Sequence, residues 1–298
     1  NYNTNYCIHF FKIFFLMKPI ILNLSAWVML PIMDGFAKHL SSTLPVLQIT
    51  WSRYFFTVII VLPIMFFFFK KNLKWSEKPK LQLIRGLLLF SANILFFYSI
   101  SVISLAKALT LAFISPLIVT ILSPILLNEK VGFKRWAAVI MGFIGSLIVL
   151  RPGFVEINLA SIAALGTGFL YGIYLIVTRK LHNSDHPLLT LLLTGVVGAI
   201  IGSMIVHTAW VQPTITEWYM MFAIGFFASI GHFLLILSLR YADASKLAPF
   251  GYFEIITNII IGYYFFNHFP DNWTFIGLFV IVSSGIYILR REALNKSI

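Results

Sequence analysis

Cysteine, acidic residues and charged residues in general are scarce in this chain. Its 298 residues include one cysteine, Cys7, so no disulfide can form within one copy. Charged residues make up only 11% of the chain, far below the ~25% of a soluble domain. The sequence has no Cys/His cluster with metal-ligand spacing, no Gly-rich phosphate loop and no nucleophile elbow. We therefore expect neither an enzyme, nor a bound cofactor or metal, nor ATP-driven transport within this chain.

Apolar sequence is abundant: 59% of the residues are hydrophobic, and the mean hydropathy is +0.91. A helix that crosses a bilayer needs ~20 predominantly apolar residues. Ten such runs fill the chain, and most charges lie between them. They are residues 18–38, 44–69, 81–101, 105–127, 135–150, 157–178, 188–207, 216–239, 244–266 and 272–289. The predicted fold class is an all-α membrane protein with ten transmembrane helices.

The net charge of +12 would by itself suggest a nucleic-acid partner, but the positions of the cations argue against one. With the N-terminus in the cytoplasm, 17 of the 22 Lys and Arg face that side, as the positive-inside rule requires. We expect a multi-pass protein of the cytoplasmic membrane with both termini in the cytoplasm, whose partners are the lipid bilayer and not nucleic acid. The 17 are Lys12, Lys18, Lys70, Lys71, Lys74, Lys78, Lys80, Arg85, Lys130, Lys134, Arg135, Arg179, Lys180, Arg240, Arg290, Arg291 and Lys296.

The ten runs divide into five plus five, so the two halves have opposite orientations in the membrane. A constant shift of 139 residues places Lys107 on Lys246 and Asn128 on Asn267, although overall identity between the halves is low. We predict a first repeat at 17–153 and a second at 154–298, after an N-terminal extension at 1–16. Inverted repeats are typical of secondary transporters, whose substrate site lies where the halves meet.

Residues 85–153 carry motifs that resemble the EamA domain of the drug/metabolite transporter superfamily, and 157–291 look like a diverged second copy. The resemblance implies a ten-helix permease with both termini in the cytoplasm. Asp34–Lys38, Arg53–Phe56, Tyr252–Glu254 and Asn267–Asp271 are similar to segments of bacterial S-adenosylmethionine uptake permeases, and other members are thought to carry riboflavin or amino acids. The motifs are Arg85–Phe90, Ala106-Lys107-Ala108, Ser115-Pro116-Leu117, Leu127–Lys130, Arg135-Trp136, Gly142–Gly145 and Leu150–Gly153.

Arg53 and Glu254 each lie about ten residues inside an apolar run, ~15 Å deep at the helical rise. Ionisable residues at that depth are costly and mark functional sites. Arg53 can hold a carboxylate or phosphate with its planar fork, and Glu254 in a low-dielectric site can exchange a proton on each transport cycle. Their opposite charges favour a pairing, either direct or through a substrate. The alternative is a structural ion pair that locks the helices together.

The remaining candidate residues lie along several runs. Asp34 is predicted to touch substrate or a coupling ion, and its spacing from Lys38 favours an ion pair. Three lysines are predicted as gate or coupling residues, although snorkelling at helix ends is the preferred explanation for them. Asn93 and His232 occupy equivalent positions in the two repeats, and three aromatic residues can stack on a heterocycle. The predicted substrate-binding residues are Arg53, Glu254, Asp34, Trp51, Asn93, Tyr98, His232 and Tyr252, and the gate or coupling residues are Lys38, Lys107, Lys246 and Glu254.

The sequence predicts a secondary transporter that moves a small polar metabolite by alternating access. This solute is an amino acid, an S-adenosylmethionine-like molecule or another heterocycle. The alternatives are a multidrug or amino-acid exporter, a membrane scaffold or accessory subunit, and a lipid-modifying enzyme. A lipid-modifying enzyme needs clustered His, Asp or Glu at one interface, which the sequence lacks. Transport direction, coupling ion and a homodimeric state are left open.

Overall fold

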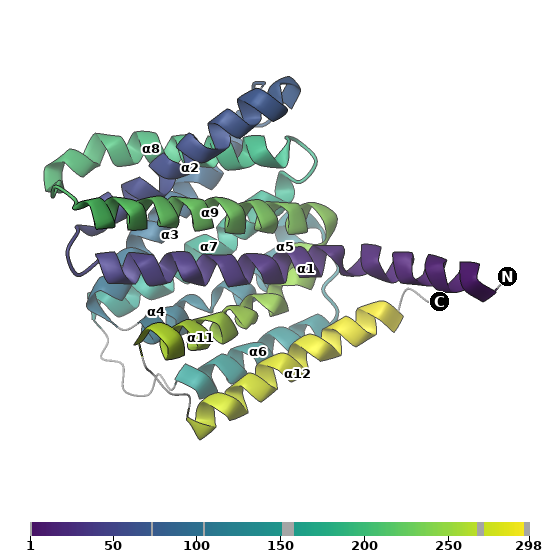
Figure 1. Cartoon of the computed structure of the whole chain (residues 1–298). Helices are drawn as coiled ribbons and strands as arrows, with labels where there is room; N and C mark the ends of the chain where they lie inside the picture. The colour runs from purple at the N-terminus through teal and green to yellow at the C-terminus, as the bar shows by residue number, and fades with distance from the viewer. Residues whose placement is uncertain (1, 73, 104, 151–157, 267–270, 295–298) are drawn as a thin grey trace.

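The structure is a computed structural model that describes all residues except 1, 73, 104, 151–157, 267–270 and 295–298. The described chain consists of helices joined by short connections (Figure 1). The first six are α1 (Tyr2–Leu40), α2 (Val46–Phe68), α3 (Pro79–Val102), α4 (Leu105–Ala112), α5 (Ser115–Leu127) and α6 (Phe133–Leu150). They are followed by α7 (Leu159–Lys180), α8 (Pro187–Ile205), α9 (Ile215–Tyr241), α10 (Ala244–Leu247), the 3₁₀ segment η4 (Ala248–Phe253), α11 (Glu254–Phe266) and α12 (Asn272–Leu294).

Each predicted run coincides with one helix or with a series of consecutive helical segments. Fewer than ten of these are long and apolar enough to be spans by length and composition alone. In the described part of the chain, seven helical segments are long and apolar enough to cross a membrane, and a shorter apolar helix covers Asn272–Tyr287. The two other predicted runs correspond to α6 and to α10–η4–α11. The seven are Met17–Leu40, Val46–Phe68, Pro79–Val102, Ala108–Leu127, Leu159–Lys180, Pro187–Ala209 and Ile215–Tyr241.

Two predicted spans are broken in the middle, which the apolar pattern did not reveal. The run 105–127 is split between α4 and α5, where Pro116 stands in the first turn of α5. The run 244–266 begins with four α-helical residues, continues as 3₁₀ helix with Pro249 in its first turn, and resumes as α11 at Glu254. Proline cannot donate the backbone hydrogen bond that would continue the preceding helix. Pro31, which lies within the run 18–38, does not break its helix, because α1 continues through it.

Local sequence explains where several helices begin and end. Thr214 and Glu217 form a capping box at the start of α9: Glu217 N–H donates to Thr214 Oγ1 at 3.3 Å, and Thr214 N–H donates to the Glu217 carboxylate at 2.7 Å. Asn158 caps α7 by accepting from the N–H of Ser161 at 2.9 Å. Asn128 ends α5 with a left-handed backbone, φ 55°.

The helices lie side by side in one bundle, and the first turns of α1 and the last turns of α12 lie at the same end of it (Figure 1). The main contacts pair α1 with α9, α2 with α8 and α9, α3 with α7 and α8, α4 and α5 with α7, α6 with α12, and α1 with α11. Helix α8 approaches α2 along a row of glycines. A Cβ at Gly198 would lie 2.3 Å from Cδ1 of Tyr54, and one at Gly202 would lie 3.2 Å from the Trp51 ring.

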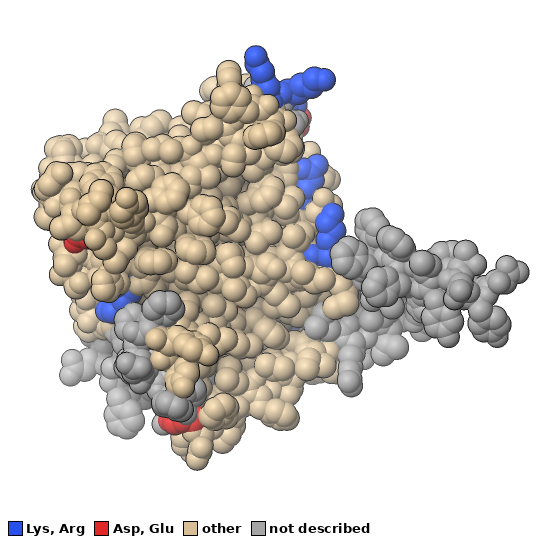
Figure 2. Space-filling view, viewed as in Figure 1, with Lys and Arg blue, Asp and Glu red and all other residues tan. Residues whose placement is uncertain are grey.

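The outer surface between the ends of the bundle is apolar. Large side chains such as Phe68, Ile125, Met204 and Phe279 are exposed on it. Figure 2 shows this face as almost free of charge, with most of its Lys and Arg side chains along the upper right edge of the view. An apolar belt of this kind fits a lipid environment. Lipid tails offer no hydrogen bonds, and the helices pair their own backbone groups.

Candidate functional site

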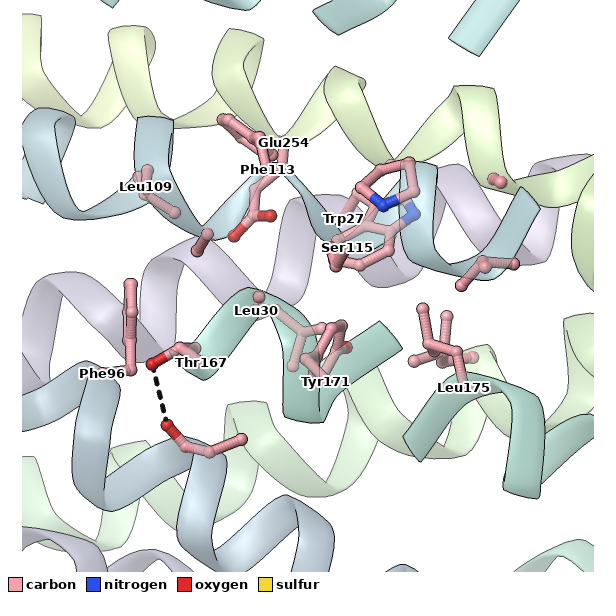
Figure 3. A pocket seen from close by; sticks show the side chains of 18 of the residues that line it. Trp27, Leu30, Phe96, Leu109, Phe113, Ser115, Thr167, Tyr171, Leu175 and Glu254 are labelled. Atoms are coloured by element: carbon pink, nitrogen blue, oxygen red, sulfur yellow. Dashed lines mark hydrogen bonds between the residues drawn. The ribbon is translucent and has the colours of Figure 1, made fainter. Parts of the chain in front are cut away.

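A cavity lies in the middle of the bundle between α1, α3, α5, α7, α9 and the α10–η4–α11 segment. Its volume, measured as the space that the centre of a water molecule can occupy, is about 100 Å³. Both broken spans contribute to its wall, since Ser115, the first residue of α5, and Glu254, the first residue of α11, line it. In Figure 3 the Glu254 carboxylate points into the cavity, and Tyr171 and Thr167 lie across from it on α7. The breaks therefore bring polar side chains to the centre of an apolar bundle.

The polar groups of this cavity are incompletely paired within the protein. Asp34 Oδ1 and the Tyr171 hydroxyl are buried and have no hydrogen-bond partner in the described part of the chain. Asp34 and Glu254 are both buried and line the same cavity. Native proteins pair nearly all buried polar atoms, so orphaned ones facing a cavity indicate a place where a ligand binds. Two carboxyl groups facing one space favour a ligand that carries positive charge.

Aromatic rings form much of the remaining wall. Trp27 meets Tyr171 edge-on, with ring centroids 6.3 Å apart, and donates its Nε1–H to Asn23 Oδ1 at 2.8 Å. Phe113, at the break between α4 and α5, lines the cavity beside Glu254 (Figure 3). Rings fixed in this way offer flat faces to a heterocycle and π-electron density to a cation. The sequence did not single out these residues, because one aromatic residue among many carries no signal of its own.

Arg53 lies behind the cavity wall and not in it. Its Nη2 contacts Nε2 of His232 at 2.6 Å, and its Nε donates to Met33 Sδ at 3.3 Å. The predicted direct ion pair with Glu254 is wrong for this conformation, because none of the described carboxylates lies within 4.0 Å of the Arg53 guanidinium. Met33 and His232 both contact the guanidinium and both line the cavity, so they stand between it and the central space.

The predicted Asp34–Lys38 pair is also not formed. Lys38 Nζ donates to the backbone carbonyls of Ile100 and Ile103, the latter at 3.4 Å. These carbonyls lie at the end of α3, where helix carbonyls have no partner within the helix and a cation is favoured. Lys38 therefore ties the ends of α1 and α3 together, and Asp34 keeps its carboxylate in the cavity.

Asn93 and His232, predicted as equivalent residues of the two repeats, both line the cavity. Asn93 Nδ2 donates to the Tyr54 hydroxyl at 2.8 Å and to the Leu89 carbonyl at 2.6 Å. The geometry thus brings four of the predicted residues, Asp34, Asn93, His232 and Glu254, to one space.

Three predicted aromatic residues lie outside the cavity lining formed by the described residues. Trp51 stacks on Phe55 and donates to Ser203 Oγ at 2.9 Å, between α2 and α8. Tyr252 is buried and packs on the Phe113 ring at 5.7 Å. Tyr98 is half-buried on α3.

The structure does not place two of the predicted gate lysines, Lys107 and Lys246, in the described cavity lining. Lys246 is buried in α10 and lies outside the described cavity lining. Lys107 lies on α4, and its side chain is outside the described residues.

Comparison with known proteins gives the family. The profile of the EamA-like transporter family matches residues 17–151 and again residues 158–290. This chain belongs to the EamA-like transporter family. Proteins of this family are transporters and not enzymes, in agreement with the absence of enzyme motifs in the sequence.

Several curated relatives of this EamA-like protein are named as transporters. An S-adenosylmethionine uptake transporter of Rickettsia bellii is 29% identical over 89% of this chain and 91% of its own length. A riboflavin transporter of Vibrio cholerae is 29% identical over 62% of this chain and 63% of its own length. A solved crystal structure at 16% identity superimposes with a TM-score of 0.76 over 93% of this chain and 98% of that one, which shows a shared fold.

A polar cluster closes one end of the EamA-like cavity, and the sequence did not predict it. Glu129, just after α5, accepts hydrogen bonds from the N–H groups of Ala244 and Ser245, each at 3.0 Å, and from Ser245 Oγ at 2.8 Å. Arg179 at the end of α7 joins Glu129 at 3.1 Å and Asp243 at 3.0 Å. Ala244 also lines the cavity, so the cluster borders it directly.

The electrostatics of Glu129 follow from these bonds. Burial acts to raise the pKa of Glu129, but the hydrogen bonds from Ser245, Ala244 and Arg179 outweigh it and hold the pKa below its ordinary value. The carboxylate is therefore ionised at neutral pH. The motif Leu127–Lys130 was the signal that could have pointed to this contact.

The position of Arg85 differs from the prediction that it is one of the cations facing the cytoplasm. It was expected at the cytoplasmic surface, but it is fully buried in α3. Its Nε donates to Thr178 Oγ1 at 2.8 Å and its Nη2 donates to the Tyr174 hydroxyl at 2.7 Å. Arg85 follows a run of cations in the sequence, so it was counted with them. A position near the start of an apolar run does not reveal which way the side chain points.

Proposed function

We propose that this protein is a secondary transporter whose substrate is a cationic heterocyclic metabolite with the chemistry of S-adenosylmethionine. The observation that carries the proposal is the central cavity, in which two carboxyl groups, Asp34 and Glu254, face aromatic walls. A sulfonium or ammonium group is attracted by both carboxylates, and a purine ring can stack on the Trp27 ring, which lines the cavity. The resemblance to the Rickettsia bellii uptake transporter over most of both chains agrees with this substrate class.

The architecture we propose is ten spans in two inverted repeats, 17–153 and 154–298. It is supported by the way the helices pair, because exchanging each span with its counterpart five spans later reproduces the contacts. The α1–α9 contact corresponds to α7–α3, α2–α9 to α8–α3, and α5–α7 to α11–α1, while α2–α8 and α6–α12 correspond to themselves. Cavity residues obey the same shift of 139, as in Asn93 with His232 and Ser115 with Glu254.

The mechanism we propose is alternating access around this cavity. The cluster at one end joins Glu129 of the first repeat to Arg179 and Ser245 of the second. Such a contact between repeats must break for the cavity to open on that side. Bound substrate relieves the repulsion between Asp34 and Glu254, and Glu254 can instead take up a proton when the cavity returns without substrate. The cation distribution of the sequence supports cytoplasmic termini and a position of the Glu129 cluster on the cytoplasmic side of the inner membrane.

The test is uptake by the purified protein in liposomes. We expect accumulation of labelled S-adenosylmethionine that unlabelled S-adenosylmethionine abolishes, whereas equal concentrations of methionine, adenosine and riboflavin compete weakly. Asp34→Asn is expected to reduce uptake at least tenfold. The matched control is Glu77→Gln, which removes an exposed carboxylate from the connection before α3.

Stronger competition by riboflavin than by S-adenosylmethionine would instead assign a flavin as substrate. The relative from Vibrio cholerae carries that name. Absence of uptake for every solute tested, from a protein that keeps its thermal transition, would reject transport through this cavity.

A further inference from the structure

A second, much smaller cavity lies beside the first one, between α2, α3, α7, α8 and α9. The space that the centre of a water molecule can occupy in it is about 10 Å³. This is enough for one water or one monatomic ion. Both buried arginines, Arg53 and Arg85, line it, together with Tyr54 and Tyr174. His232 belongs to the walls of both cavities. Nothing in the proposed transport cycle uses this second space.

The two guanidinium groups at this cavity have only neutral hydrogen-bond partners. Arg85 donates to Thr178, Tyr174, the Thr190 carbonyl and Thr194. Within the described residues, no carboxylate lies within 4.0 Å of either guanidinium, although Asp34 acts on Arg53 electrostatically over a longer distance. Two positive charges that are taken out of water near one another are expensive unless a negative charge accompanies them.

Hydrogen-bond accounting shows that the cavity wall has donors in excess. An arginine can only donate, so His232 Nε2 accepts from Arg53, and its Nδ1–H then donates to the Tyr174 hydroxyl at 3.0 Å. The Tyr174 oxygen also accepts from Arg85 at 2.7 Å, so its own O–H needs an acceptor elsewhere. The Tyr54 oxygen likewise accepts from Asn93 at 2.8 Å and leaves its O–H to donate.

We propose that this small cavity is a binding site for a monovalent, halide-sized anion, with chloride as the physiological candidate. The two guanidinium groups supply the charge, and the hydroxyls of Tyr54 and Tyr174 supply hydrogen bonds. The volume separates this ligand from a substrate carboxylate, which needs room for three heavy atoms. A water molecule would fit but would bring no negative charge to the two guanidinium groups. Anion binding at this site can be measured without transport, so the proposal can be tested separately from the identity of the transported solute.

The test is thermal unfolding of the purified full-length protein in detergent. Sodium gluconate is replaced stepwise by sodium chloride or sodium bromide at constant ionic strength. We expect the unfolding temperature to rise with chloride and with bromide along a saturating curve. The variant Tyr174→Phe removes one donor and keeps the ring, so it should raise the half-saturating chloride concentration about tenfold. Lys74→Gln, which removes an exposed cation, should leave that concentration unchanged.

Arg85→Gln should abolish the chloride response. If that variant does not fold, Tyr174→Phe decides the question. Superimposable unfolding curves in chloride and gluconate would overturn the proposal, because they mean that the cavity holds water only. The proposal is equally overturned if Tyr174→Phe folds and keeps the wild-type half-saturating concentration. Neither result would affect the proposed transport of a cationic solute.

Discussion

Arg53 and His232 are joined by a 2.6 Å contact between Nη2 and Nε2, which links α2 to α9 directly behind the central cavity. Because the guanidinium can only donate, it fixes the histidine with Nε2 unprotonated and Nδ1 protonated. His232 then presents one side to the main cavity and the other to Arg53 and Tyr174. The pair thus connects the two halves of the chain at the level of the proposed substrate site.

The first prediction concerns this contact. Arg53→Ala should reduce counterflow transport in liposomes at least tenfold. The reason is that the substitution leaves buried His232 without its donor and removes a positive charge that acts on Asp34, and removal of one partner from a buried polar group is costly. Lys74→Ala, which changes an exposed lysine, should transport like the wild type. A folded Arg53→Ala protein with near wild-type rates would show that this contact is dispensable.

The second prediction concerns the cluster that closes one end of the cavity. Glu129→Gln should lower the free energy of unfolding at neutral pH by about 2 kcal/mol, because it removes charge-assisted hydrogen bonds from Ser245, Ala244 and Arg179. It should also make a cysteine placed in the cavity wall easier to label from that side.

The pH dependence of this effect has a definite sign. The pKa of Glu129 is lowered in the folded protein, so its stabilisation is complete above the ordinary value of 4.5 and is lost as the pH falls through the folded value. Unfolding temperatures of wild type and Glu129→Gln should therefore differ at pH 7 and approach each other as the pH falls below 4.5. A difference that does not shrink as the pH falls below 4.5 would contradict the assignment.

The third prediction compares two glycines. A Cβ at Gly198 would lie 2.3 Å from Tyr54, whereas a Cβ at Gly132 meets no atom within 4 Å. Gly198→Ala should therefore force α8 away from α2 and destabilise the protein by about 1–3 kcal/mol. Gly132→Ala should leave the unfolding temperature unchanged within a degree or two. Equal behaviour of the two variants would mean that α2 and α8 can separate at little cost.

The helices were predictable from the sequence because a long apolar run can satisfy its backbone in lipid only as a helix. The breaks at Phe113–Ser115 and in η4 were not, since they depend on how neighbouring helices accommodate Pro116 and Pro249. In the site, depth along a helix predicted Glu254, which lines the cavity, and Arg53, which lies behind its wall, because depth does not define the helical face. Trp51 lies only two residues before Arg53, yet it points toward Ser203 on α8.

The fourth prediction tests the inverted architecture. On a Cys7→Ser background, Trp75→Cys should react with a membrane-impermeant maleimide only from the cytoplasmic side, and Gln212→Cys only from the opposite side. Both positions are exposed, in the connections α2–α3 and α8–α9. These connections lie an odd number of proposed spans apart, so labelling of both from the same side is incompatible with ten spans in two inverted repeats.

The most direct test of the central claim, that Asp34 and Glu254 select a cationic solute, is a competition measurement. S-adenosylmethionine and its uncharged thioether analogue, S-adenosylhomocysteine, differ at the sulfur by one methyl group and one positive charge. Each is tested for the concentration that halves uptake of labelled substrate. We predict that the wild type prefers the sulfonium at least tenfold and that Asp34→Asn and Glu254→Gln each reduce this preference about tenfold, since an amide keeps the shape and removes the charge. An unchanged preference in both folded variants would contradict the account.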